Sequence, residues 1–458
     1  MQTKNDFSQG KISTHILNIA GPMMVAQLIN VLYNIVDRIY IGRIPGNGVA
    51  TLAMSGLGIC LPLIAIITAF ANLYGMGGSP LCSIARGQGD NQRAEEIMGN
   101  SFAMLVGTGI VIMAIGYLFK TKLLLLFGAS VDTLPYADGY MSIYLLGTLP
   151  VMIGLGLNSF INSQGFSKIG MMTVCIGAVI NLILDPVFIF GFNMGVQGAA
   201  AATVIAQLVS ALWTLQFLTG NKTILKLKRS CFKLKGELVK KIIALGTAGF
   251  CMAMTNSIVA IVCNRTLQSY GGDTYVAIMT IINSIREVAS LSGQSVANAS
   301  QPVLGFNYGA KKYQRVLDGI KFTTITCILL MTLVWAFITA FPGQLIRIFS
   351  TNDQVLLLGM SAVRLYFFGF FAMSLQMAGQ SASVGLGKSK QAIFFSIFRK
   401  VIIVAPLTII LPRFIGVKGV FIAEAISNFI GGGACYITLI FTVIKDLRKQ
   451  ARLQTTES

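Results

Sequence analysis

The feature that most constrains the fold of this chain is a series of apolar stretches, each long enough to cross a lipid bilayer. A membrane-spanning helix needs about 20 predominantly apolar residues, and the 458-residue sequence contains twelve such stretches. Strands of a membrane barrel are excluded, because they alternate in hydropathy and are only about 9–11 residues long. The predicted spans are residues 15–36, 50–74, 97–119, 139–161, 170–191, 197–219, 239–263, 274–298, 318–341, 361–383, 392–411 and 418–441.

Composition agrees with this pattern. Hydrophobic residues make up 54% of the chain and charged residues only 11%, whereas soluble domains average about 25% charged residues. We therefore predict an all-α integral membrane protein of the cell membrane. The polar segment Met1–Lys11 precedes a first span that is too long for the apolar region of a signal peptide, so no cleavable signal is expected.

The distribution of positive charge predicts the orientation. Of the 35 Lys and Arg residues, 23 fall on the side of the two termini and eight on the opposite side. Because cytoplasmic loops are enriched in Lys and Arg, both termini are expected to be cytoplasmic. The net charge of +19 does not indicate a nucleic-acid partner, since no soluble domain surrounds the basic segment Lys222–Lys241.

The chain contains an internal repeat with an offset of 220–222 residues. Each repeat has six spans, an even number, so both begin on the same side and are expected to be related by a pseudo-two-fold axis along the membrane normal. We predict an N-terminal lobe (1–220), a basic cytoplasmic linker (221–241) and a C-terminal lobe (242–458). The matched segments are Gly89–Gln92 with Gly309–Lys312, Tyr144–Gly147 with Tyr366–Gly369, Gly165–Lys168 with Gly387–Lys390, Pro186 with Pro406, and Gly195–Gly198 with Gly416–Gly419.

One carboxylate lies deep in a predicted span. Asp185 is surrounded by apolar residues, and a charge at that depth costs at least about 2.5–3.5 kcal/mol. Asn181 lies one helical turn earlier on the same face, and Pro186 frees a backbone carbonyl near residue 182. This group of oxygens suits a proton or a small cation, although a purely structural role for Asp185 stays open.

Other polar residues of the first repeat are predicted at the same depth, in the outer half of the bilayer. Two carboxylates that meet in a low dielectric do not both stay ionised, so one is expected to bind a proton; the same oxygens also suit sodium, by the ligand preferences of other hard cations. Alternatively, Asp37 pairs with Arg38 at the membrane surface, and Thr203, Tyr140 and Tyr144 contribute only to packing. The residues at this depth are Asp37, Asn181, Asp185, Thr203, Tyr140 and Tyr144.

Further charges lie within the spans of the second repeat. Arg286 and Glu287 are adjacent and point about 100° apart, and Glu424 is expected to pair with Arg399 or Lys400. Pro22 in the first span is a candidate hinge. The candidates for substrate binding or coupling are Tyr140, Tyr144, Glu287, Gln207 and Asn34.

Three motifs give the chain a family resemblance: Val36–Gly42 at the end of span 1, Asn181–Pro186 in span 5, and Gly198–Thr203 in span 6. With them the chain resembles the multidrug and toxic compound extrusion (MATE) family along its whole length. The resemblance implies two six-helix lobes around a cleft and a cation site at Asp37, Asn181, Asp185 and Thr203. One branch of that family carries acidic residues in spans 7 and 10, whereas these spans contain none in this chain. A cation site in the C-terminal lobe, of the type found in that branch, is therefore not expected.

The predicted function is export of cationic amphipathic drugs by antiport with protons or sodium, by a monomer that contacts membrane lipid and uses no cofactor. The main alternative is a flippase for a lipid-linked precursor, which should need a cationic cavity. A major-facilitator exporter is disfavoured, because Asp37–Arg43 follows the first span rather than the second. A membrane enzyme is disfavoured, because the chain has a single histidine and its cysteines lack metal-ligand spacing. An ATP-driven pump is disfavoured, because the sequence has no Walker motif.

Overall fold

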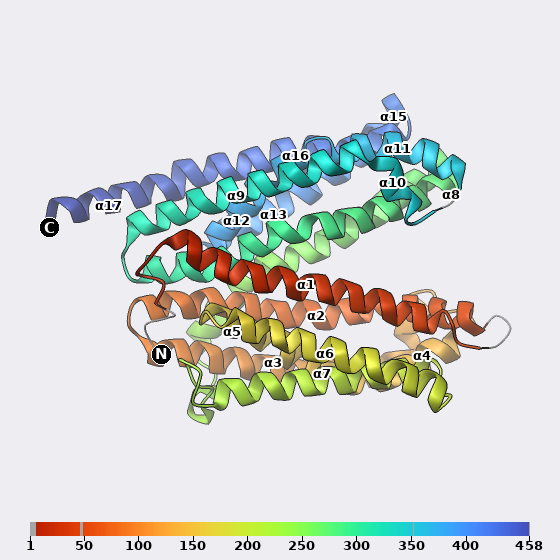
Figure 1. Cartoon of the computed structure of the whole chain (residues 1–458), viewed down its shortest axis with the longest axis horizontal. Helices are drawn as coiled ribbons and strands as arrows, with labels where there is room; N and C mark the ends of the chain where they lie inside the picture. The colour runs from red at the N-terminus through yellow and green to blue at the C-terminus, as the bar shows by residue number, and fades with distance from the viewer. Residues whose placement is uncertain (1–5, 46–48, 351, 458) are drawn as a thin grey trace. The chain divides into compact units, whose positions relative to one another are not determined.

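The chain is almost entirely helical in the computed structural model, which describes residues 6–45, 49–350 and 352–457 (Figure 1). No β-strand occurs in these ranges. Within them, eleven helices are long and apolar enough to cross a membrane. The predicted all-α membrane architecture is therefore confirmed.

The helices form two compact units. The described part of the first comprises residues 22–85 and 90–246, and that of the second comprises residues 6–21, 86–89 and 247–457. The division falls at residues 246 and 247, a few residues after the predicted linker. It also differs from the predicted lobes because residues 6–21 and 86–89 group with the second unit.

The first unit is a bundle of long helices that run side by side (Figure 1). Helix α1 spans Ile12–Ile41, and the boundary between the units within it falls between Gly21 and Pro22. The other elements are α2 (Val49–Gly87), α3 (Asn91–Leu126), α4 (Leu134–Tyr144), the 3-10 turn η2 (Leu145–Gly147), α5 (Thr148–Ser163), α6 (Ser167–Pro186), the π-helical turn η3 (Val187–Gly191), α7 (Val196–Thr219) and the 3-10 turn η4 (Arg229–Phe232).

The second unit repeats much of this order. It contains α8 (Gly236–Gly309), α9 (Tyr313–Ala340), α10 (Pro342–Arg347), α11 (Asp353–Phe367), the 3-10 turn η5 (Phe370–Ala372), α12 (Met373–Gly385), α13 (Ser389–Ile397), the π-helical turn η6 (Phe398–Val404), α14 (Ala405–Ile410), α15 (Pro412–Ile415), α16 (Lys418–Leu439), the π-helical turn η7 (Ile440–Ile444) and α17 (Lys445–Glu457).

Helix α8 contains two of the predicted spans. They meet at Gly272, where φ is 67° and the helix is interrupted. The part up to Gly272 is one of the eleven apolar helices, whereas the part corresponding to predicted span 274–298 is helical but not among them. The reason is its composition, because Arg286 and Glu287 and several Ser and Asn residues interrupt the apolar run.

The sequence repeat has a structural counterpart at matched turns. Predicted spans 4 and 10 are each broken by a 3-10 turn, η2 and η5, within or next to their matched motifs. The loops after them need glycine in both repeats, because Gly165 and Gly387 have φ of 87° and 73°. Before the last helix of each repeat, Gly195 and Gly416 have φ of 55° and 62°. Identical backbone requirements thus explain why these glycines recur.

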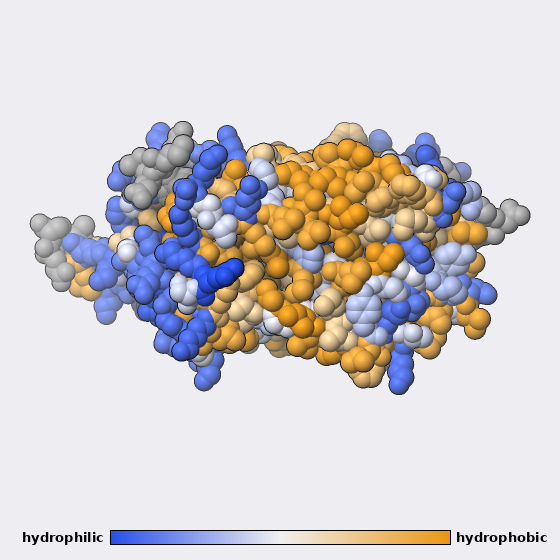
Figure 2. All heavy atoms as spheres, turned by 90° about the horizontal axis from the view of Figure 1, so that it is seen from below, coloured by the Kyte–Doolittle hydropathy of each residue, from blue (hydrophilic) through white to orange (hydrophobic). Residues whose placement is uncertain are grey.

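The surface has the polarity that a membrane protein needs. On the face seen in Figure 2, hydrophobic residues cover the middle of the helices and hydrophilic residues gather toward their ends. Large side chains such as Leu118, Leu333 and Phe441 are 77%, 68% and 71% exposed. Such exposure is unfavourable in water and favourable against lipid chains.

The predicted linker is bound to the first unit rather than extended between lobes. The side chain of Gln164 is fully buried, and its Oε1 accepts hydrogen bonds from the Thr223 hydroxyl (2.8 Å) and from the backbone nitrogens of Ile224 (3.0 Å) and Leu225 (2.8 Å). Asn100, also fully buried, accepts from the nitrogen of Lys235 (2.8 Å). Two polar side chains thus fix the path of the basic segment.

The segment before α1 is held on the second unit in a similar way. Arg315 donates through Nη1 to the carbonyl oxygen of Gly10 (2.8 Å) and through Nη2 to that of Phe7 (3.0 Å). Asn307 Nδ2 also donates to the Phe7 carbonyl (3.0 Å), and Lys312 Nζ donates to that of Ser8 (3.0 Å). The chain that leads into each repeat is therefore fastened by buried or partly buried polar side chains.

Replacing Gln164 by Ala should release the linker. The change removes the acceptor of three hydrogen bonds, each worth about 0.5–1.5 kcal/mol net, and leaves two backbone nitrogens without their partner. Trypsin should then cleave the purified protein faster at the lysines between residues 222 and 235. Gln216→Ala, at an exposed glutamine of α7, is the matched control, and equal cleavage rates in the two variants would contradict the assigned role of Gln164.

Candidate functional site

Two carboxyl groups meet inside the first unit. Asp185 of α6 is fully buried, and its carboxyl lies within hydrogen-bonding distance of the carboxyl of Asp37 on α1. When both carboxyls are ionised, no hydrogen-bond donor among the described residues reaches Asp37 Oδ1 or Asp185 Oδ2. A proton on either carboxyl supplies that donor, so the pair is satisfied by one shared proton.

Asn181 connects this pair to α7. Its Nδ2 donates to Asp185 Oδ1 at 3.2 Å and to the Thr203 hydroxyl at 3.3 Å. Only 2% of Asn181 is exposed. The structure thus brings together the four residues that the sequence placed at one depth, Asp37, Asn181, Asp185 and Thr203, from three different helices.

Local sequence explains the close approach of α6 and α7. Helix α7 begins with a run of small residues, Gly198–Ala202, and a Cβ at Gly198 would lie 2.7 Å from the carbonyl carbon of Phe188. About three turns further along, Gly177 of α6 faces Ser210 of α7, where a Cβ would lie 2.5 Å from the hydroxyl oxygen. Larger residues at these positions would separate the two helices and, with them, Asn181 from Thr203.

Pro186 marks a change of helix geometry in α6. A proline in a helix has no N–H for the carbonyl four residues earlier. Here α6 ends at Pro186 and continues as the π-helical turn η3. π-helical turns occur mostly as single turns and often at functional sites, and this one directly follows Asp185.

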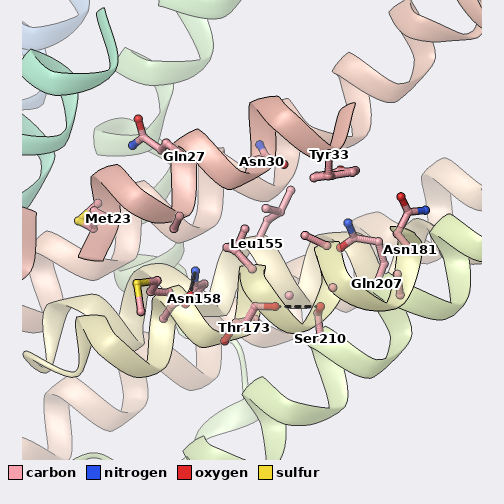
Figure 3. Close-up of a pocket in the computed structure, with 18 of the residues that line it drawn as sticks. Met23, Gln27, Asn30, Tyr33, Leu155, Asn158, Thr173, Asn181, Gln207 and Ser210 are labelled. Atoms are coloured by element: carbon pink, nitrogen blue, oxygen red, sulfur yellow. Dashed lines mark hydrogen bonds between the residues drawn. The ribbon is translucent and has the colours of Figure 1, made fainter. Parts of the chain in front are cut away.

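A cavity of about 370 Å³ opens beside the carboxyl pair within the first unit (Figure 3). Asn181 and Thr203 line one part of it, whereas Asp37 and Asp185 do not belong to the lining. The expectation of a chamber lined by carboxylates therefore needs correction: an amide and a hydroxyl lie between Asp185 and the cavity. No charged side chain occurs among the described residues that line it.

Two tyrosines, Tyr33 and Tyr140, lie near the carboxyl pair, and Tyr144 stacks on Tyr140. Tyr140 and Tyr144 of α4 are 3% and 5% exposed, and their rings stack with centroids 5.7 Å apart. Tyr140 lies close enough to Asp37 to interact with it electrostatically, and Tyr33 of α1 to interact with both Asp37 and Asp185. Of the three, only Tyr33 lines the cavity.

The remaining candidates are divided between the cavity and other places. Gln207 lines the cavity (Figure 3). Asn34 does not; it is exposed, and its Nδ2 donates to the carbonyl of Asn30 on its own helix. Glu287 belongs to the second unit, where its side chain is exposed. Neither Asn34 nor Glu287 lines the cavity.

Sequence reasoning missed most of the polar lining. Gln27 and Asn30 of α1 and Asn158 and Asn162 of α5 line the cavity, and the Oδ1 atoms of Asn158 and Asn162 are buried without a partner among the described residues. A signal existed: residues 27, 30, 34 and 37 of the first span, like 158 and 162 of the fourth, follow helical spacing. Amides recurring on one face of a membrane helix indicate a polar interior.

The intramembrane charges of the second unit form a separate cluster. Arg399 Nη2 lies 2.6 Å and Lys400 Nζ lies 2.9 Å from Glu424 Oε1. The predicted pairing of Glu424 is confirmed, with both basic residues instead of one. Gln376 accepts a hydrogen bond from Arg399 Nη1, and Gln380 donates to the Ser396 hydroxyl at 2.6 Å. These two glutamines, the polar residues noted in span 10, are thus occupied by contacts within the unit.

Two repeated units of membrane-spanning helices, with a polar cavity beside a buried carboxyl pair, define a multi-pass membrane transporter. The MatE family model matches residues 22–187 and 249–410. This is more than half of the chain, so the chain belongs to the MatE family, as its motifs had indicated.

Individual relatives are distant but cover nearly the whole chain. The multidrug export protein MepA of Staphylococcus haemolyticus is 25% identical over 436 residues, which is 93% of this chain and 93% of that protein. A crystal structure of MATE in complex with MaL6 has a TM-score of 0.90 at 22% identity and covers 97% of this chain and 99% of its own. An outward-facing multidrug resistance MATE family transporter of the MOP superfamily also has a TM-score of 0.90, at 22% identity, covering 97% and 98%.

The close contact at Gly198 can be tested by adding one methyl group. Gly198→Ala places a Cβ 2.7 Å from the carbonyl carbon of Phe188 and 2.9 Å from the nitrogen of Ile189, both backbone atoms that cannot rotate away. We expect a loss of about 1–3 kcal/mol of stability, measured by thermal unfolding in detergent. Gly191→Ala, at the end of η3 and with nothing within 4 Å of the added Cβ, should unfold like the parent. Equal losses of stability in both variants would show that the contact at Gly198 is not responsible.

Proposed function

We propose that this chain is a secondary active exporter of cationic amphipathic compounds, driven by protons that bind at the Asp37–Asp185 pair. Family membership and the similarity to a multidrug export protein support the export function. The observation that supports proton coupling is that the fully buried Asp185 carboxyl interacts directly with the half-buried Asp37 carboxyl. Such a pair binds a proton when it is closed off from water, because two adjacent charges in a low dielectric repel strongly.

Sodium is the second candidate ion, and the orientation of Asn181 argues against it. A sodium ion needs oxygen ligands, as other hard cations do. Asn181 instead turns its NH₂ group to both Asp185 and Thr203, which places a hydrogen-bond donor where a cation would need an acceptor. A proton on the carboxyl pair requires no such reorientation.

The cavity chemistry supports a cationic, partly apolar cargo. A volume of about 370 Å³ lies within the range of drug-sized sites, about 300–1,000 Å³. Its lining combines amide oxygens with Met23, Met171 and the ring of Tyr33, and flexible Met side chains adapt to different apolar shapes. A flippase for a pyrophosphate-linked lipid should present basic side chains here, and the described lining has none.

The proposed cycle couples the proton to the cargo through charge. With the termini cytoplasmic, as the Lys and Arg distribution predicts, a proton from outside binds the pair and removes its negative charge. Cationic cargo then loses its electrostatic attraction and leaves. Pro22, which lies at the boundary between the two units within α1, is the candidate hinge for the accompanying bend. Release of the proton to the cytoplasm restores the negative charge and the affinity for the next cation.

Asp185→Asn should abolish proton-driven export without preventing insertion. The amide has nearly the same shape but cannot exchange a proton, so dye transport in everted vesicles should fall to that of vesicles lacking the transporter. Asp132→Asn, at an exposed aspartate outside the long helices, should transport like the parent. Normal export by the Asp185 variant, at equal protein abundance, would refute the assignment.

The choice between the two ions can be tested by changing the gradient. In vesicles that contain the purified protein, an imposed pH gradient should drive dye movement, and a sodium gradient at constant pH should not, because Asn181 presents a donor to the carboxyl pair. Movement driven by sodium alone would contradict proton coupling and would require the Asn181 amide to present its oxygen instead.

A further inference from the structure

The second unit buries more positive than negative charge. Arg399 and Lys400 are 4% and 6% exposed, and Glu424, 5% exposed, is their only carboxylate partner among the described residues. Arg286 of α8 borders the same cluster and interacts electrostatically with Glu424. Three cationic side chains therefore share one carboxylate in a part of the chain that the membrane encloses, where uncompensated charge is costly.

Glu424 has little capacity left for Arg286. Its Oε1 already accepts from Arg399 Nη2 at 2.6 Å and from Lys400 Nζ at 2.9 Å, and its Oε2 contacts Lys400 Nζ at 3.3 Å. The π-helical turn η6 holds both basic residues toward Glu424. Gly431 of α16 makes room for the Arg399 side chain, since a Cβ there would lie 2.8 Å from Arg399 Cγ. The local sequence is thus adapted to keep two cations on one carboxylate.

Arg286 is the cation without a counter-charge in contact. No salt bridge of the described residues includes it, and its Nε is buried without a hydrogen-bond partner there. The neighbouring Glu287 is exposed and likewise forms no ion pair within the described ranges. Arg286 is half-buried, and because an arginine carries its charge at every physiological pH, a change of protonation does not remove this charge.

A small cavity lies against these groups. It has a volume of about 30 Å³, and Arg286, Lys400 and Glu424 line it together with Asn256, Asn283 and Tyr366. The Asn amides and the Tyr366 hydroxyl can donate hydrogen bonds, and Val259, Val404 and Val420 form apolar walls. Guanidinium and ammonium groups, amide donors and a hydroxyl around one small space are a set of groups that bind an anion.

We propose that this cavity in the second unit is a binding site for a single small monovalent anion of halide size. The anion offsets the charge of Arg286 and accepts hydrogen bonds from the donors around it. A cavity of about 30 Å³ holds about two waters or one such ion, and it is too small for a pyrophosphate group or for a drug-sized cargo. The site is separate from the carboxyl pair of the first unit and does not depend on the proposed export function.

The site can be tested by anion exchange at constant ionic strength. Thermal unfolding of the full-length protein in detergent is compared in sodium chloride, sodium bromide and sodium gluconate, whose anion exceeds the cavity. A ligand at about fivefold excess over its Kd should raise Tm by about 1 °C in a chain of 458 residues. We therefore expect higher Tm values in chloride and bromide than in gluconate. Equal Tm values in the three salts would overturn the proposal.

Two substitutions should change the chloride effect in opposite directions. Arg286→Gln removes the uncompensated charge, so the difference in Tm between chloride and gluconate should disappear. Glu424→Gln leaves three cations without a carboxylate, so the difference should become larger than in the parent. Arg364→Gln, an exposed arginine of the same unit, is the matched control and should keep the parental difference. A chloride effect that persists in Arg286→Gln would show that the anion binds elsewhere.

Bromide gives a second test that does not depend on whether the variants fold. Crystals of the parent protein grown in bromide should show an anomalous scattering peak beside the Arg286 guanidinium. An ordered cavity without such a peak, at a bromide concentration that raises Tm, would overturn the location.

Discussion

The structure of the first unit depends on one constraint: a carboxylate buried in a membrane helix must be neutralised or hydrogen-bonded. Asp185 is fully buried, and ionised aspartate at the centre of a membrane helix costs at least about 2.5–3.5 kcal/mol. Asn181 supplies one hydrogen bond to it and Asp37 provides a partner that can share a proton. The same arrangement that makes this burial tolerable is the one at which we propose that a proton binds and leaves.

That arrangement requires α6 and α7 to approach closely, which side chains of ordinary size would prevent. The small residues of Gly198–Ala202 and Gly177 allow it. Without a hydrophobic driving force between helices in lipid, contacts through small residues are a main source of helix association. Packing and chemistry are therefore linked here: the positions that let the helices touch also set the distance between Asn181 and Thr203.

The two units share a backbone plan but differ in charge. Matched glycines, 3-10 turns and π-helical turns recur in both repeats. The first unit uses this plan to hold two carboxyls beside an amide-lined cavity, and the second uses it to hold Arg286, Arg399 and Lys400 around Glu424. The duplicated sequence thus retained the turns that the backbone requires, while the buried side chains diverged to opposite charge.

The sequence alone determined the membrane class, the number of repeats and the four residues that meet at the carboxyl pair: the two aspartates themselves, Asn181 and Thr203. Their signals are local: span length, a constant offset, and a charge in an apolar run. The family follows from the same motifs. Only the tertiary structure decided that Asp185 lies behind Asn181 and Thr203, that Asn34 does not line the cavity, that the linker is fastened to Gln164, and that Arg286 has no carboxylate in contact. These facts depend on which helix faces come together, and helical spacing within one segment does not specify its partner.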